Sequence, residues 1–175
     1  MKRIRINDIN DELFEDAWKL YCESFPLNEQ RALDDQKNAM MQEDYHFEAL
    51  VQAGRFIGIL LYWEQSGFIF VEHFAIASNM RSGGLGTKVM GLLLENQKAV
   101  ILEIEPVSDE QSEKRLNFYA RLGFLKNNFM HIQPPFRRQF TGHRLELMSY
   151  PEKLNIEIYN EFAIYFHNRV MEFSE

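Results

Sequence analysis

A short segment of this sequence combines an arginine and a serine with three glycines in four positions. Its residues, with the threonine that follows, are Arg81, Ser82, Gly83, Gly84, Leu85, Gly86 and Thr87. Glycine lets the backbone adopt positive φ and approach a ligand with no Cβ in the way. Free N–H groups and the dipole at the start of a following helix attract phosphate oxygens. The segment is therefore a candidate diphosphate site, although a turn that only permits tight strand-to-helix packing would have the same composition.

The order of residues in this segment excludes two well-known phosphate-binding patterns. The dinucleotide pattern G-x-G-x-x-G is absent because the glycines fall at positions 83, 84 and 86. The pattern G-x-x-x-x-G-K-[ST] is absent because Thr87 precedes Lys88 instead of following it. We therefore expect neither of these nucleotide sites.

Carboxylates occur within two segments that are otherwise apolar. Glu72 and Glu103 lie in strand-like patterns, where a carboxylate is costly unless it lines a wet cleft. The period of two in a strand places Glu103 and Glu105 on one face, and it places Glu72 on the face of Phe74. By the same rule His73 points to the opposite face, as a structural histidine whose hydrogen bonds are satisfied. A solvent-facing strand end is the simplest interpretation of Glu105.

The apolar pattern predicts the elements that position these residues. An antiparallel meander is expected over 46–76, because aromatic and β-branched residues alternate around hairpin-length spacers. Beyond it, helical and buried-strand patterns alternate. The expected strands are 3–9, 47–51, 56–63, 68–76, 99–104, 129–136 and 143–149, and the expected helices are 12–24, 31–42, 87–97, 109–122 and 155–171.

This order, βααβββαβαββ followed by a C-terminal helix, predicts an α/β (α+β) fold. We expect a mixed, mostly antiparallel central sheet with helices on both faces. A chain of 175 residues, 46% of them hydrophobic, is long enough for one domain with a full core. We expect a single domain over 1–175, with a core over 1–150 and a C-terminal helical extension over 151–175. The aromatic residues of the last helix suit either the core or the seam of a homodimer.

Charge and composition argue against several classes of protein. The net charge of −7 does not fit a nucleic-acid partner, which calls for a basic surface. No run approaches the roughly 18 apolar residues that span a bilayer, and the basic start is not followed by an apolar signal segment. We therefore expect a cytoplasmic protein with no membrane partner. Cys22 is expected to be a small, partly buried hydrophobe, and no metal site is predicted.

Three blocks of the sequence together resemble the GNAT acetyltransferase family. Arg81, Gly84 and Gly86 occupy the fixed positions of its motif [RQ]-x-x-G-x-[GA], after an apolar strand end. The segment 101–104 is similar to the family's next strand, and 118–124 is similar to its F-Y-x-x-x-G-F ending. The blocks stand in the expected order and spacing. The order of elements also agrees with the family fold to about residue 150.

The resemblance implies acetyl-CoA as the cosubstrate. Its pyrophosphate is expected on the N–H groups of residues 81–87, and its pantetheine arm is expected to pair with the strand 68–76 like an added strand. The resemblance also implies four further cofactor-binding residues, Phe74, Ala75, Ile76 and Ser112. Ser112 departs from the family pattern, in which an Asn is common there, and Arg115 stands where a small residue is usual.

The resemblance also implies how the reaction proceeds. The sheet is expected to splay open between the strands of Glu72 and Glu103, where a backbone N–H can polarise the thioester carbonyl. Tyr119 is expected to protonate the departing thiolate, because a phenol with a pKa of about 10 keeps its proton at pH 7. Aromatic packing is the alternative role of Tyr119. Glu72 and Glu103 rank equally as the base, acting directly or through water.

These features predict an N-acetyltransferase that passes the acetyl group of acetyl-CoA to a primary amine. Direct attack is expected, because no cysteine lies in the motif blocks. The link 106–111 is longer than in relatives that acetylate peptide N-termini, so a small molecule is favoured over a protein. The segment 25–29 resembles one that lines the acceptor cleft in the family, although a proline after a helix is ordinary. The alternative function is a non-catalytic acyl-CoA-binding or sensing domain.

Overall fold

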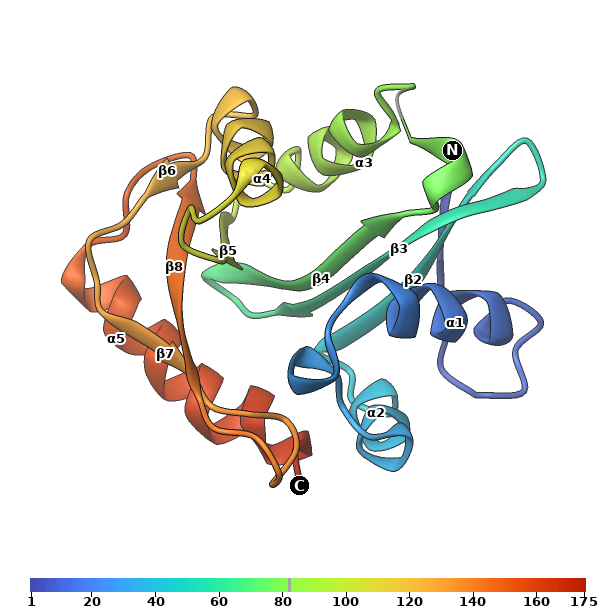
Figure 1. The fold of residues 1–175 in the computed structure, drawn as a ribbon, viewed down its shortest axis with the longest axis horizontal. Coiled ribbons are helices and arrows are strands. Elements are labelled where there is room, and N and C mark those ends of the chain that lie inside the picture. The colour runs from blue at the N-terminus through green and yellow to red at the C-terminus, as the bar shows by residue number, and fades with distance from the viewer. Residues whose placement is uncertain (82) are drawn as a thin grey trace.

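The computed structural model describes residues 1–81 and 83–175, so Ser82 lies outside the described residues. Within them, eight strands form a sheet of order β1-β2-β3-β4-β5-β8-β6, and β7 pairs with β8 (Figure 1). The strands are β1 (Lys2–Arg5), β2 (Tyr45–Gln52), β3 (Arg55–Glu64), β4 (Phe68–Ile76), β5 (Ala99–Ile104), β6 (Leu125–Lys126), β7 (His131–Gln133) and β8 (His143–Tyr150). The pair β4 and β5 is parallel, and the other pairs are antiparallel. The predicted mixed, mostly antiparallel sheet is confirmed.

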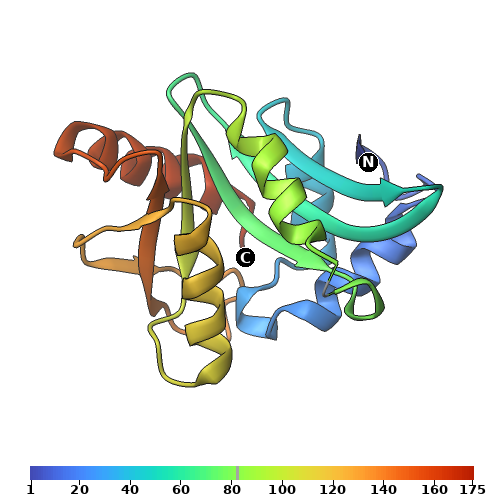
Figure 2. The same ribbon diagram turned by 90° about the horizontal axis from the view of Figure 1, so that it is seen from above.

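Helices cover both faces of this sheet. α3 (Leu85–Leu94) and α4 (Glu110–Arg121) lie on one face, and α1 (Phe14–Ser24) and α2 (Leu33–Met40) lie on the other (Figures 1 and 2). Each face has its own hydrophobic core, because successive side chains of a strand point to opposite sides. The sheet therefore separates the α3 and α4 side of the molecule from the α1 and α2 side.

The C-terminal segment is helical from α5 (Ile156–Tyr165) through Phe173. Its residues Phe162 and Phe166 are buried, with ring centroids 5.2 and 5.4 Å from the ring of Phe70. Each ring buried in this way contributes about 1.5–3 kcal/mol to stability. The aromatic residues of this helix thus pack in the core that they share with α1 and α2, one of the two roles expected of them. No helix in the described part of the chain is long and apolar enough to cross a membrane.

Most predicted elements are present with shifted ends, and β4 and β5 have the predicted bounds. α1 ends at Ser24 because Phe25 precedes Pro26, a position that disfavours helical backbone. The predicted strand 129–136 was too long. Only β7 forms there, since Pro134 and Pro135 cannot donate to a ladder, and the two-residue β6 precedes it.

β4 and β5 separate part-way along their length. The last pair of their parallel ladder joins Val71 to Leu102, yet β4 continues to Ile76 and β5 continues to Ile104. On their outer sides, β4 stays paired with β3 and β5 stays paired with β8. The inner edges therefore diverge, and the splay predicted between the strands of Glu72 and Glu103 is confirmed.

Candidate active site

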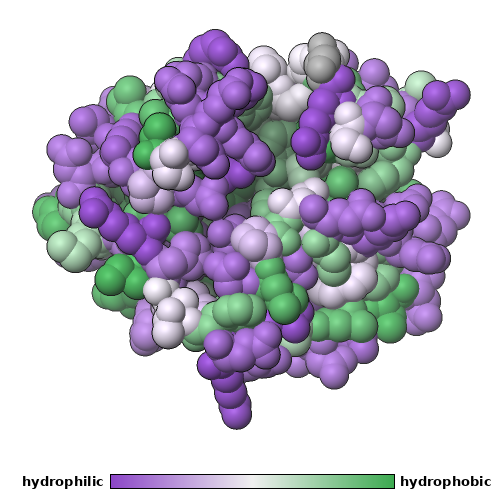
Figure 3. Space-filling model, in the orientation of Figure 1, coloured by the Kyte–Doolittle hydropathy of each residue, from purple (hydrophilic) through white to green (hydrophobic). Residues whose placement is uncertain are grey.

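A cleft of about 770 Å³ lies in this splay and crosses the sheet. That volume is in the range of small-molecule and cofactor sites. One end opens between α3 and α4, where the surface is hollow (Figure 3). The other end reaches α1, the 3₁₀ turn Leu27–Glu29, β7 and β8. The predicted site residues that line the cleft are Glu72, Phe74, Ala75, Ile76, Arg81, Gly84, Leu85, Gly86, Thr87, Glu103 and Tyr119.

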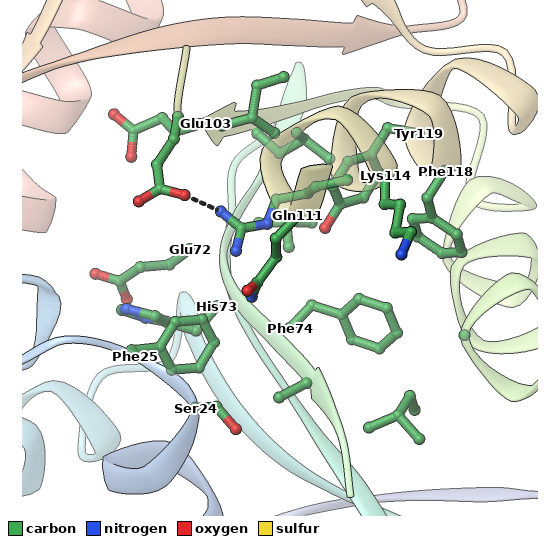
Figure 4. A pocket seen from close by; sticks show the side chains of 18 of the residues that line it. Ser24, Phe25, Glu72, His73, Phe74, Glu103, Gln111, Lys114, Phe118 and Tyr119 are labelled. Carbon is green, nitrogen blue, oxygen red and sulfur yellow. Dashed lines mark hydrogen bonds and ion pairs between the residues drawn. The ribbon is translucent and has the colours of Figure 1, made fainter. Parts of the chain in front are cut away.

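The side chains of the cleft fall into two groups (Figure 4). Phe25, Glu72 and His73 lie together on one side of the close-up, and Tyr119 and its neighbours on α4 lie on the other. The first group belongs to the α1 and α2 face of the sheet, and the second belongs to the α3 and α4 face. After the roles that the sequence predicts for their residues, we call the first part of the cleft the acceptor end and the second part the donor end.

The glycine-rich turn starts α3 at the donor end. Gly84 is the N-cap of the helix and has φ of 67°, in the left-handed region that glycine favours. A Cβ on Gly86 would stand 3.4 Å from the ring of Phe118, so this glycine lets α3 and α4 pack closely. The turn therefore permits close packing, and its residues Gly84, Leu85, Gly86 and Thr87 also line the cleft, while the diphosphate site stays a prediction. Gly83 is exposed beside the cleft, and Ser82 lies outside the described residues.

Basic side chains gather at the donor end. Arg81 donates from Nε to the carbonyl oxygen of Ile76 at 3.0 Å, which folds its side chain along the edge of β4. Lys114, Arg115 and Arg121 of α4 also line the cleft. Together with the dipole of α3, these cations favour an anionic ligand here.

Tyr119 lies at the inner part of the donor end. Its ring is 5.0 Å from that of Phe118 and 5.5 Å from that of Phe124, so it does pack among aromatic residues. Its side chain nevertheless lines the cleft, and its hydroxyl makes no hydrogen bond to another described residue. Burial raises the pKa of Tyr119 to about 12, and Arg115 opposes this effect. The hydroxyl therefore keeps its proton at neutral pH.

Glu72 is fully engaged in the structure. One carboxylate oxygen forms an ion pair with the guanidinium of Arg31, and the other accepts from Trp63 Nε1 at 3.2 Å. The side chains of Glu72 and Arg31 are 1% and 0% exposed. Both oxygens of this buried carboxylate therefore already have partners, and its charge compensates that of a buried arginine. The structure thus favours a positioning role for Glu72 over the predicted role as base.

A β-bulge corrects the predicted directions of two side chains. Leu61 pairs with His73 and Tyr62 pairs with Val71, so Glu72 is the extra residue of β4. Beyond a bulge, the alternation of side-chain directions along the strand shifts by one residue. Glu72 and His73 consequently face the same side, whereas they were predicted on opposite faces, and Glu72 does not share a face with Phe74.

His73 is buried next to the acceptor end. Its ring lies 4.9 Å from that of Tyr21 and 4.4 Å from that of Phe25. Its Nε2 is 2.9 Å from the backbone oxygen of Glu29, while its buried Nδ1 has no partner among the described residues. Burial lowers the pKa of His73 to about 4, so the ring is neutral at physiological pH. His73 is thus a buried histidine as predicted, but the expectation that its hydrogen bonds are satisfied is correct for Nε2 alone.

Glu103 lines the cleft from β5, as predicted. Its carboxylate pairs with His131 of β7, and both side chains are more than nine-tenths buried. Glu105 pairs with Arg115 at 2.7 Å at the mouth of the cleft and is 47% exposed, in agreement with the solvent-facing interpretation. Glu72 and Glu103 therefore lie at the acceptor end, whereas Glu105 is paired with a cation of the donor end.

Ser112 requires a correction. Its backbone N–H donates to Asp109 Oδ1 at 2.7 Å, and its hydroxyl oxygen accepts from the backbone N–H of Asp109 at 3.0 Å. This reciprocal capping box starts α4. Ser112 is 3% exposed and is absent from the described residues that line the cleft. Its side chain thus serves the helix start, and the implied contact with CoA is not supported.

The sequence did not assign a role to Arg31 or Glu29. Arg31 is contacted by residues far away in the sequence, including Glu72 and the carbonyl oxygens of Val170 and Phe173, so no local pattern marks it. Glu29 could have been found from the segment 25–29, which was expected to line an acceptor cleft.

Comparisons with known proteins agree with this architecture. The model of the acetyltransferase (GNAT) family matches residues 10–124. YjbC of Bacillus subtilis (strain 168), which carries the name of an acetyltransferase, is 33% identical over 132 residues, or 67% of this chain and 66% of that protein. The matched region thus spans slightly less than two thirds of YjbC.

Solved structures give the same result. A GNAT-family protein of Bacteroides thetaiotaomicron superposes with a TM-score of 0.89 and 27% identity, over 98% of each chain. An aminoglycoside 6'-N-acetyltransferase, solved in complex with coenzyme A, has a TM-score of 0.60 and 14% identity over 85% of this chain and 96% of that one. At that identity the likeness is one of fold alone.

A mixed sheet that splays at its parallel pair beside a glycine-rich helix start has the architecture of a GNAT-type transferase. The chain belongs to the acetyltransferase (GNAT) family. The sequence predicted an N-acetyltransferase with acetyl-CoA as cosubstrate, and this is the enzyme class of the family.

Proposed function

We propose that this chain transfers the acetyl group of acetyl-CoA to a primary amine of a small molecule by direct attack. The observation that carries the proposal is one cleft that crosses the sheet, with Arg81, Lys114 and Arg121 at one end and Glu29, Glu72 and Glu103 at the other. A cosubstrate with phosphates fits the donor end, and a cationic amine fits the acceptor end.

The donor end offers three features that suit CoA. The first N–H groups of α3 and the side chains of Arg81, Lys114 and Arg121 suit the pyrophosphate. The open edge of β4 at Phe74, Ala75 and Ile76 suits the amides of the pantetheine arm, which would pair with it as an added strand. The cleft then leads the thioester to the start of the splay, next to the bulge at Glu72.

Residues near the start of the splay would carry the chemistry. Backbone N–H groups on the open edge of β4 polarise the carbonyl and stabilise the negative charge that develops on its oxygen. Tyr119, which holds its proton at neutral pH, donates it to the departing thiolate. A carboxylate at the acceptor end takes a proton from the amine. Of the two that were predicted, Glu103 is better placed, because both oxygens of Glu72 are engaged.

The lining of the acceptor end suits a small acceptor. On one side it consists of Ser24, Phe25, Pro26 and Glu29, and on the other it consists of Gln133 and Leu145. The structural neighbours do not discriminate between acceptors. Aminoglycoside acetyltransferases and a ribosomal-protein-S18-alanine N-acetyltransferase of Escherichia coli match this chain at similarly low identity, 14–16%.

The proposal is tested by measuring binding and turnover separately. Calorimetric titration gives the affinity for acetyl-CoA. Release of free thiol is then followed with spermidine, kanamycin A, L-lysine, n-butylamine and a lysine-containing peptide as acceptors. We expect micromolar binding and turnover of at least one small amine. Binding without turnover on any of these amines would instead support the alternative, a non-catalytic acyl-CoA-binding domain, and turnover of the peptide alone would contradict the small-molecule acceptor.

A further inference from the structure

Four carboxylates line the cleft, and three of them have strong partners. Glu72 is paired with Arg31, Glu103 is paired with His131, and Glu105 is paired with Arg115. The fourth, Glu29, has no arginine or lysine within 4 Å among the described residues. Its nearest basic group is His143 of β8, whose Nε2 lies 3.5 Å from Oε1. Glu29 is therefore the carboxylate of the cleft with the most freedom to bind a ligand cation.

The position of Glu29 is fixed relative to the splay. It ends the 3₁₀ turn that follows α1, and its backbone oxygen is 2.9 Å from Nε2 of His73. His73 directly follows the bulge residue on β4, at the point where β4 leaves β5. Glu29 thus lies next to the start of the splay, on the face opposite α3 and α4, and its side chain is 19% exposed to the cleft.

The surroundings of Glu29 control its protonation. Burial raises the pKa of Glu29 to about 7, the carboxylates of Glu105 and Glu103 add to this effect, and Arg115 opposes it. The neighbouring His73 is neutral at this pH. Proton acceptors work best when their pKa lies near the working pH, because they are then both ionised and basic enough to take a proton. Beside Glu29, both ring nitrogens of His143 are buried without hydrogen-bond partners among the described residues. These two nitrogens could therefore form hydrogen bonds with a ligand.

We propose that Glu29 binds the acceptor as an ammonium ion and is the catalytic base that accepts its proton. This inference rests on the proposed function. The protons balance as follows. Glu29 takes the first proton from the ammonium, and the free amine attacks the thioester carbon. The C–N bond forms and the C–S bond breaks, and Tyr119 protonates the thiolate. The second proton that the nitrogen loses passes to solvent, from which Tyr119 regains a proton. The net reaction releases one proton, which leaves through Glu29 to solvent.

The assignment restricts the class of acceptor. A buried carboxylate that must hold the substrate before deprotonating it selects amines that are cationic at neutral pH, such as primary alkylamines. Weakly basic aromatic amines arrive uncharged and gain neither the ion pair nor the proton transfer. The nearby carboxylate of Glu103 adds to the preference for a cation, whereas the charge of Glu105 is compensated by Arg115 at the mouth of the cleft.

The test uses Glu29→Gln, Glu29→Asp and the matched control Glu105→Gln, with the amine of the panel that wild type turns over best. Wild-type kcat should rise with pH and level off above about 7, as the carboxylate loses its proton. The pH at which kcat reaches half of its plateau is the midpoint of this profile. Glu29→Gln should lower kcat about 100-fold or more and abolish the midpoint, while the affinity for acetyl-CoA and the Tm stay as in wild type. Glu29→Asp should keep the midpoint at reduced kcat.

Glu105→Gln removes a neighbouring charge without removing the base. Its kcat on the plateau should stay within about threefold of wild type, and its midpoint should move to lower pH, because Glu105 raises the pKa of Glu29. If wild type turns over amines but Glu29→Gln keeps both kcat and the midpoint, or changes KM alone, Glu29 is not the base and the proposed function stands. If wild type binds acetyl-CoA and turns over no amine, the proposed function and this inference both fail.

Discussion

At the scale of single residues, Tyr119 illustrates how packing and chemistry can share one side chain. Its ring fills the space between Phe118 and Phe124, and its hydroxyl borders the cleft. With its pKa raised to about 12, the phenol holds its proton more strongly than a thiol does, whose pKa is about 8.5. Transfer of this proton to a thiolate is therefore uphill on these values, so it has to be coupled to the collapse of the tetrahedral intermediate that expels the thiolate.

Tyr119→Phe tests that role. We expect kcat to fall about 10- to 100-fold, with the affinity for acetyl-CoA and the free energy of unfolding almost unchanged, because the ring stays and its hydroxyl has no partner among the described residues. Steady-state rates and calorimetric titration give both values. Tyr159→Phe is the matched control, since its hydroxyl donates to Met130 far from the cleft. Equal rates for Tyr119→Phe and wild type would leave Tyr119 with packing alone.

At the scale of elements, the glycine turn and α3 should respond differently to the same kind of change. Gly84→Trp places a bulky side chain at the helix start, in a left-handed conformation that also costs roughly 1 kcal/mol. We expect loss of acetyl-CoA binding by at least 100-fold while the far-UV circular dichroism stays native. Gly91→Ala, inside α3 with open space around its Cα, should keep binding and raise stability by up to about 1 kcal/mol. Retained binding in Gly84→Trp would place the pyrophosphate elsewhere.

The elements also show where sequence patterns succeed and where they stop. β4 and β5 were predicted with correct bounds because both are apolar runs flanked by turn residues. The bulge at Glu72 could not be predicted, since period-two alternation assumes an unbroken ladder. Ser112 was predicted to contact CoA because of its place in a motif. Its hydrogen bonds with Asp109, three residues earlier, instead use it to start α4.

At the scale of the whole molecule, Arg31 joins parts of the chain that are distant in sequence. Its guanidinium pairs with Glu72 at the bulge of β4 and donates to the carbonyl oxygens of Val170 and Phe173 in the C-terminal segment. The ring of Phe136 lies 4.3 Å from the guanidinium carbon. The bulge that shapes the start of the splay is thus held by the last residues of the chain, far outside the motif that identifies the family.

Arg31→Met should therefore destabilise the whole protein. It leaves the carboxylate of Glu72 buried without its cation, which costs about 3–5 kcal/mol, measured as the free energy of unfolding in urea. Arg31→Met combined with Glu72→Gln should recover most of this loss, because no buried charge remains. Lys37→Met, which breaks the exposed pair with Asp34, is the control and should cost no more than about 1 kcal/mol. If the double variant is no more stable than Arg31→Met, the arginine stabilises the fold through the C-terminal carbonyl groups, and its ion pair with the bulge contributes little.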